Sequence, residues 1–172
     1  GAFAFEGCTI LESVELPGEL NSIGAGAFAN CSSIEIVEIP DTVSEISDSA
    51  FNNCTALNSV SLPKGITVIE DGVFSGCSAM ESIVIPETVT TIQAEAFAYS
   101  ALKSVTIPAS VQFIGREAFT YTPIESLEFS GTPSVRVIEN YAFERTTNLK
   151  TVTIPASVET MGTGVFSKSG LT

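Results

Sequence analysis

The sequence lacks histidine and tryptophan altogether, and it has only seven basic side chains against twenty acidic ones in 172 residues, a formal net charge of −13. A nucleic-acid-binding surface needs a basic stripe, which seven scattered cations do not supply. No apolar run approaches the ~18–20 residues of a membrane-spanning helix, and no charged segment followed by an apolar stretch opens the chain. These absences exclude nucleic-acid binding and membrane insertion.

What the sequence does contain is a large apolar fraction, since 44% of the residues are hydrophobic. A disordered acidic tail would lack those residues, so the chain is able to bury a core. The acidity is uneven: residues 1–86 hold twelve acids and one base, whereas residues 87–172 hold eight acids and six bases. Such asymmetry bears on association and solubility, not on the fold.

A repeat of about 23 residues organises the whole chain. A small residue followed by phenylalanine recurs at intervals of 22 to 24 residues, at Phe5, Phe28, Phe51, Phe74, Phe97, Phe119, Phe143 and Phe166. Proline keeps the same period at Pro17, Pro40, Pro63, Pro86, Pro108 and Pro155, with Ser130 in the remaining place. A unit of this length cannot close a core alone, so stacked units must bury each other's faces. The sequence therefore predicts a repeat solenoid.

Each repeat contains one clear strand signal and one weaker signal. The segments that end at the prolines, such as LESVEL and LKSVTI, alternate apolar and polar residues and predict short strands of one parallel sheet. A Val-x-x-Ile step, as at Val43/Ile46 and Val111/Ile114, indicates a second short strand on the opposite side. The small and polar residues before each phenylalanine favour a single turn of α- or 3₁₀-helix.

We expect a single domain of 22–25-residue repeats over residues 1–172, which begins and ends partway through a repeat and is therefore expected to be a segment of a longer protein. The exposed ends of such a stack predict end-to-end self-association. The repeats are 1–17 (partial), 18–40, 41–63, 64–86, 87–108, 109–130, 131–155 and 156–172 (partial).

The run from Cys8 to Pro17, followed by Leu20 to Phe28, resembles the leucine-rich repeats of the BspA-like (Treponema pallidum-type) family, and the resemblance extends over essentially all 172 residues. It implies a right-handed curved stack whose parallel sheet lines the concave face. It also implies an extracellular or cell-surface protein that takes part in adhesion and binds host or matrix proteins. The chain departs from the pattern in two shortened repeats, around Ala101 and Pro123, and in one longer repeat near Gly131–Thr132.

Four cysteines follow phenylalanine by three residues, at Cys8, Cys31, Cys54 and Cys77, and serine or threonine takes this place in later repeats. That exchange favours a buried ladder of thiols and hydroxyls, with a disulfide or a metal site as weaker alternatives. Zinc would need a Cys-x-x-Cys pair or histidine, and a cysteine nucleophile would need a general base. We therefore expect no enzyme, no metal and no cofactor.

The outward residues of the predicted sheet are the candidate partner-binding site. Short hydroxyl side chains predominate there, and they suit a protein, or less well a glycan, lying across a flat surface. The absence of aromatic residues argues against tight binding. The two columns are Ser13, Ile36, Ser59, Ser82, Ser104, Ser126 and Thr151, and Glu15, Glu38, Ser61, Val84, Thr106, Glu128 and Thr153.

Tyr99 and Tyr121 occupy the same place in the two shortened repeats and are secondary candidates. Packing over the shortened turn is the favoured interpretation, and anchoring of a partner is the alternative. The predicted function is a non-enzymatic protein-binding or adhesion module for a host or matrix protein. The alternative is a structural spacer that holds another domain away from the cell.

Overall fold

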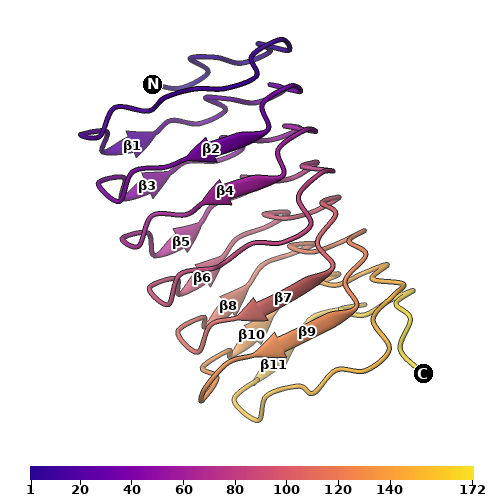
Figure 1. Ribbon diagram of the computed structural model, residues 1–172. Helices are drawn as coiled ribbons and strands as arrows, with labels where there is room; N and C mark the ends of the chain where they lie inside the picture. Colours follow the sequence, from indigo (N-terminus) through magenta and orange to yellow (C-terminus); the bar gives the residue numbers. More distant parts are fainter.

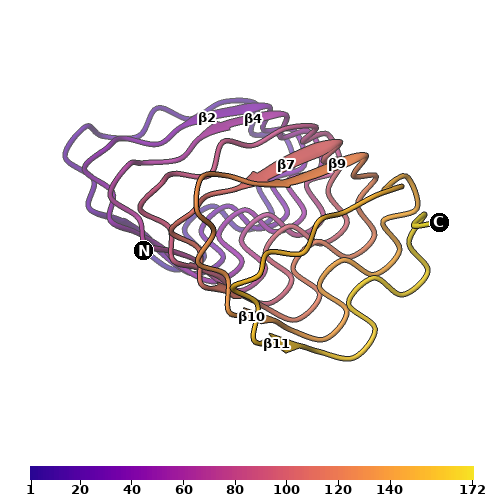
Figure 2. The same cartoon turned by 90° about the horizontal axis from the view of Figure 1, so that it is seen from below.

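A computed structural model describes residues 1–172 as one solenoid whose coils stack side by side from the N-terminus to the C-terminus (Figure 1). All strand pairings are parallel, and each joins residues about one repeat apart. Seen along the stack, the labelled strands fall on two opposite sides of the coil (Figure 2). The predicted repeat solenoid is confirmed.

One side of the coil carries the strands that end near the periodic prolines: β2 (Ile36–Glu38), β4 (Ser59–Ser61), β7 (Ser104–Ile107) and β9 (Ser126–Phe129). β2 pairs with β4 and β7 pairs with β9, and no other partner joins these strands in a sheet. Val37 and Val105 point inward and are buried, whereas their neighbours in the strand are exposed. The alternation in the sequence therefore predicts correctly which residues point outward.

The Val-x-x-Ile steps form the second strands on the opposite side. β1 pairs with β3, while β5, β6, β8, β10 and β11 form one five-stranded sheet. Ile46, Ile92 and Ile114 are the buried residues of their strands. The strands are β1 (Ser22–Ile23), β3 (Glu45–Ile46), β5 (Val68–Ile69), β6 (Thr91–Ile92), β8 (Phe113–Ile114), β10 (Val137–Ile138) and β11 (Thr160–Met161).

The phenylalanines form a continuous column through the molecule. Neighbouring rings are nearly parallel, with centroids 5.1–5.7 Å apart from Phe5 to Phe166. This separation corresponds to offset stacking, which adds to the stabilisation from burial. The five rings from Phe51 to Phe143 are fully buried, whereas Phe5 is 40% exposed.

The segment around each phenylalanine, which we call the turn edge (residues 72–77 in the fourth repeat), differs from the predicted helical turn. No residue there is helical. Instead, the N–H groups of Gly72, Phe74 and Gly76 donate to carbonyls of the next coil at 2.8–2.9 Å, and the intervening N–H groups bond within their own coil. The same three bonds to the next coil recur from the first repeat to the repeat that contains Phe143.

This pattern requires a left-handed backbone at two places in every coil. The residues two before and two after each phenylalanine have φ between 54° and 75° in all eight repeats. Side chains other than glycine cost about 1–2 kcal/mol in this conformation. Glycine or asparagine occupies the place two after phenylalanine in the first four repeats, but Tyr99, Tyr121, Arg145 and Lys168 occupy it in the last four.

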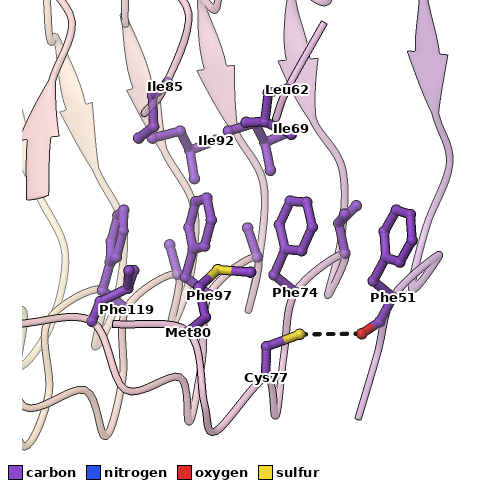
Figure 3. Close-up of a cluster of buried hydrophobic side chains, with 14 of the residues drawn as sticks. Phe51, Leu62, Ile69, Phe74, Cys77, Met80, Ile85, Ile92, Phe97 and Phe119 are labelled. Carbon is purple, nitrogen blue, oxygen red and sulfur yellow. Dashed lines mark hydrogen bonds between the residues drawn. The ribbon is translucent and has the colours of Figure 1, made fainter. Parts of the chain in front are cut away.

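The cysteine ladder is present, and all four cysteines are free thiols. The Sγ of Cys31, Cys54 and Cys77 donates to a phenylalanine carbonyl of the preceding coil at 3.0–3.3 Å, and Figure 3 shows the bond from Cys77 to Phe51. Thr122 and Thr146 instead donate to the phenylalanine carbonyl of their own coil. Burial raises the pKa of the Cys54 thiol to about 12 and also raises that of Cys77, so neither is a ready nucleophile or metal ligand.

Candidate interaction surface

The fourteen outward residues proposed from the sequence are all exposed, and they form one surface that we call the strand face. Strand pairing aligns Ile36 with Ser59, and Ser104 with Ser126, so the columns run straight from coil to coil. An isolated bridge extends this alignment from Ile36 back to Ser13. The side chains are arranged by the two-residue period of the strands and by the repeat of the coils.

Two large apolar side chains interrupt this mostly hydroxyl and carboxylate surface. Val84 is 84% exposed and Ile36 is 53% exposed. Single exposed aliphatic side chains are common on protein surfaces, but these two are accessible apolar area on a face whose other outward positions are polar. Sequence reasoning placed both residues in the columns but did not single them out as the exposed apolar residues of the face.

The strand face is not one continuous sheet. No strand forms at Ser82–Val84 or at Thr151–Thr153, although both segments occupy the place of a strand in their repeats. Lys103, just before β7, links the segment at Ser82–Val84 to the next coil, because its N–H donates to the Glu81 carbonyl at 3.1 Å and its Nζ lies 2.7 Å from Glu81 Oε2. The surface therefore consists of two paired strips and less regular segments between and beside them.

Two hollows lie on this side of the molecule. A groove of about 670 Å³ lies over the first three repeats, and its lining includes Glu15, Glu38 and the ion pair of Asp41 with Lys64, whose Nζ and Oδ2 are 3.0 Å apart. A larger groove of about 1070 Å³ separates β9 from residues 151–157. Neither groove was foreseen from the sequence, although the longer repeat near Gly131 signalled where the second one opens.

The two tyrosines lie outside the strand face, on the turn edge. Their rings stack with centroids 4.9 Å apart, and the Arg145 guanidinium lies 4.8 Å from the centre of the Tyr121 ring. Tyr99 is 52% exposed and Tyr121 is 45% exposed. Partial desolvation, followed by the neighbouring Tyr121 and three glutamates, raises the pKa of the Tyr99 hydroxyl. The rings stack on each other and remain about half exposed to solvent.

The structure contains no group of three or more histidine, cysteine, aspartate or glutamate side chains that could hold a metal ion. No helix is long and apolar enough to cross a membrane. The strongly shifted thiol pKa values rise, which is the direction that makes a nucleophile less reactive.

The model of the BspA-type leucine-rich repeat region matches residues 1–125 and 67–172, with six copies of the repeat. The chain belongs to the BspA-type leucine-rich repeat family. No curated protein matches it.

Solved structures of leucine-rich repeat proteins share the fold. A leucine-rich repeat protein of Bacteroides ovatus is 31% identical, with a TM-score of 0.72 over 88% of this chain and 45% of that protein. A leucine-rich cell surface protein of Faecalibacterium prausnitzii is 31% identical, with a TM-score of 0.70 over 96% of this chain and 54% of that protein. The Treponema pallidum leucine-rich repeat protein is 30% identical, with a TM-score of 0.72 over 97% of this chain and 67% of that protein. This BspA-type chain thus spans about half the length of the first two relatives.

Proposed function

We propose that this chain is a non-enzymatic protein-binding module of a cell-surface or secreted protein, and that it presents the strand face to a host or matrix protein. The observation that carries the proposal is the exposure of all fourteen outward residues, with Ile36 and Val84 as apolar contacts among short polar side chains. Membership of a repeat family that generally supplies interaction and surface modules supports it. So does the similarity to a cell surface protein of Faecalibacterium prausnitzii.

The physical basis is the low conformational cost of such a surface. Serine and threonine lose little side-chain entropy when a partner covers them, and the strands beneath them hold them in fixed columns. The exposed aliphatic side chains supply apolar area that a partner removes from water, at about 25 cal/mol per Å². The face carries acidic residues and no base among the fourteen, so a partner with a basic surface is favoured.

A structural spacer is the second candidate. The phenylalanine column is stacked without a break from Phe5 to Phe166, and the three turn-edge hydrogen bonds recur from coil to coil. A stack held in this way resists bending, which suits a domain that carries another domain away from a surface.

Capture of partners from an extract of host extracellular matrix separates the two candidates. The immobilised wild-type chain is compared with the double variant Ser82→Arg/Ser104→Arg, and bound proteins are identified by mass spectrometry. Gln112→Arg is the matched control, because Gln112 is exposed and precedes β8 on the opposite side of the coil. We expect the same partner on the wild type and on Gln112→Arg, and its loss from the double variant. Equal capture by all three would remove the strand face from consideration, and no capture by any would favour the spacer.

A further inference from the structure

On the strand face the coils separate between β9 and residues 151–154, as they also do around Ser82–Val84, while the same coils remain joined elsewhere. β9 has β7 as its only sheet partner, and no backbone hydrogen bond joins β9 to residues 151–154 of the next coil. In the same two coils the Phe119 N–H donates to the Ala142 carbonyl at 2.8 Å, and Val137 of β10 pairs with Phe113 of β8. These two coils are therefore separated on the strand face, whereas they are hydrogen-bonded to each other at the turn edge and through β8 and β10 on the opposite side.

The opening lies at the longest repeat of the chain. Its two extra residues are at Gly131–Thr132, and Gly131 has a left-handed backbone with φ of 56°. Hydrogen bonds from Ser130 N–H to the Ile107 carbonyl and from Ser134 N–H to the Ala109 carbonyl hold this loop against the preceding coil. The loop lines one end of the groove of about 1070 Å³, and the two long walls are β9 and residues 151–157.

The groove exposes the groups that a further strand would cover in a complete sheet. β9 presents a backbone edge with no partner, which is a template for another strand. Beneath it, Phe129, Val152 and Ile154 are only partly buried, whereas Val105 and Ile107 in the closed part of the same sheet are 2% and 0% exposed. The hydroxyl of Ser157, in the lining of the groove, is buried and has no hydrogen-bond partner.

The charge of the groove identifies the kind of strand that it accepts. Glu125 and Glu128 are exposed in its wall, and neither forms an ion pair. The nearby Lys150 directs its Nζ to the Thr147 carbonyl at 3.3 Å. A segment that enters the groove therefore meets uncompensated carboxylates, which favour cationic side chains.

We propose that the groove between β9 and residues 151–157 binds an extended segment of a partner protein by strand addition, with apolar residues that alternate with lysine or arginine. The partner backbone bonds to the free edge of β9, its apolar side chains cover Phe129 and Val152, and its cationic side chains face Glu125 and Glu128. This mode of recognition takes affinity from the main chain and specificity from alternate side chains. The inference rests on the proposed binding function and names its site and ligand class.

Three fluorescent octapeptides test this proposal by anisotropy. The first alternates valine and lysine, the second alternates valine and glutamate, and the third is the valine–lysine peptide with methylated backbone nitrogens. We expect the first peptide to bind at least about tenfold more tightly than the other two. Equal binding of the methylated peptide would show charge attraction without strand addition and would overturn the proposal. Absence of binding of the first peptide at about 1 mM would also overturn it.

Two variants locate the site. Glu128→Lys is expected to weaken binding of the valine–lysine peptide about tenfold, whereas Glu38→Lys, at the equivalent place on β2, is expected to change it less than about twofold. Deletion of Gly131 and Thr132 restores the usual repeat length, allows residues 151–154 to pair with β9, and is expected to abolish binding while raising the melting temperature. If Glu38→Lys weakens binding as much as Glu128→Lys does, the groove is not the site.

Hydrogen exchange tests the site in the wild-type chain, so a folding defect of a variant does not affect the result. Addition of the valine–lysine peptide to the wild-type chain is expected to slow amide exchange in β9 and in residues 151–154, and to leave β2 and β4 unchanged. Concentration-dependent dimers that the deletion abolishes would instead identify a second copy of this chain as the occupant and overturn the proposal. A matrix partner that still binds the deletion variant would overturn the groove as the partner site while leaving the proposed function standing.

Discussion

The turn edge and the strand face belong to the same coils but are joined to different degrees. On the turn edge, three N–H groups per coil bond to the next coil, and the phenylalanine rings stack throughout. On the strand face, strands pair only as β2 with β4 and as β7 with β9. The turn edge therefore holds the stack together, and the strand face is left free to vary in outline and in chemistry.

This division explains how the chain tolerates repeats of unequal length. The shortened repeats around Ala101 and Pro123 and the longer one near Gly131 leave the spacing of the phenylalanine rings at 5.1–5.7 Å. The extra residues are absorbed next to the strand face, where a groove opens. A solenoid built in this way is able to change its binding surface without a change in its core.

The largest expected effect is the loss of a central ring. Phe97→Ala removes a fully buried side chain that stacks on Phe74 and Phe119, so we expect the free energy of unfolding to fall by about 3–5 kcal/mol. Val84→Ala on the strand face is the matched control, with an expected change within about 0.5 kcal/mol. Urea denaturation measures both, and similar losses in the two variants would end the distinction between turn edge and strand face.

The left-handed positions of the turn edge give the next effect. Gly72→Ala places a Cβ at a backbone φ of 61° and 3.3 Å from the Ser49 Oγ, which is expected to cost about 1–2 kcal/mol. The reverse exchange in the next coil, Glu95→Gly, relieves strain at φ of 55° and is expected to stabilise the chain by up to about 1 kcal/mol. Thermal or urea unfolding measures whether Gly72→Ala lowers stability and Glu95→Gly raises it. A loss of stability in both variants would show that the left-handed backbone does not set the preference for glycine at these positions.

The cysteine ladder makes the turn edge sensitive to alkaline pH. Burial raises the pKa of Cys54 from its ordinary value of 9.0 to about 12, so the unfolded chain loses this proton first as the pH rises. The contribution of the neutral Cys54 thiol to the free energy of unfolding is thus complete below pH 9 and is lost as the pH approaches 12. In this range the free energy of unfolding falls by at most about 1.4 kcal/mol per pH unit.

The loss attributable to Cys54 is about 1.4 kcal/mol at pH 10. Comparison of urea unfolding at pH 8 and pH 10 for the wild type and for Cys54→Thr measures it, because threonine carries no proton that titrates in this range. Identical pH dependence of the two proteins would show that the thiol is not held neutral by the fold.

The smallest effect is expected on the strand face, where Lys103 pairs with Glu81 of the preceding coil, beside the interruption in the sheet. Both side chains are about half exposed, so Lys103→Met is expected to cost less than about 1 kcal/mol, and the difference is expected to shrink at 1 M salt. A salt-independent loss above about 2 kcal/mol would mean that this pair, and not the turn edge alone, holds these two coils together.

The sequence predicts the coils, the second set of strands and the outward residues, because period-23 and period-2 patterns report directly on stacking and on strand alternation. The prediction of one continuous sheet on the strand face is wrong, since no strand forms at Ser82–Val84 or at Thr151–Thr153. The turn edge is harder to predict. Glycine and asparagine suggest left-handed residues at Gly76 and Asn53, but Tyr99 and Arg145 occupy the same place without that signal. The small and polar residues of the turn edge also fit a helical turn, so the sequence predicts one. In the structure, hydrogen bonds between coils take the place of the bonds within a helix.

The groove beside β9 could not be predicted for a different reason. An insertion marks a loop, but whether that loop closes or opens the sheet depends on which coil it is bonded to. Here the bonds of Ser130 and Ser134 run to the preceding coil, and no local sequence pattern specifies that choice. The stacking of Tyr99 on Tyr121, which leaves both rings about half exposed, likewise depends on a contact between coils that the length of the turn does not specify.

The turn-edge hydrogen bonds also give the stack a direction. Every such N–H points toward the C-terminal end, from Phe3 in the first coil to Arg145 in the seventh. All coils that stack through this edge must therefore run in the same direction, because a reversed coil would set N–H groups against N–H groups and leave buried donors unpaired.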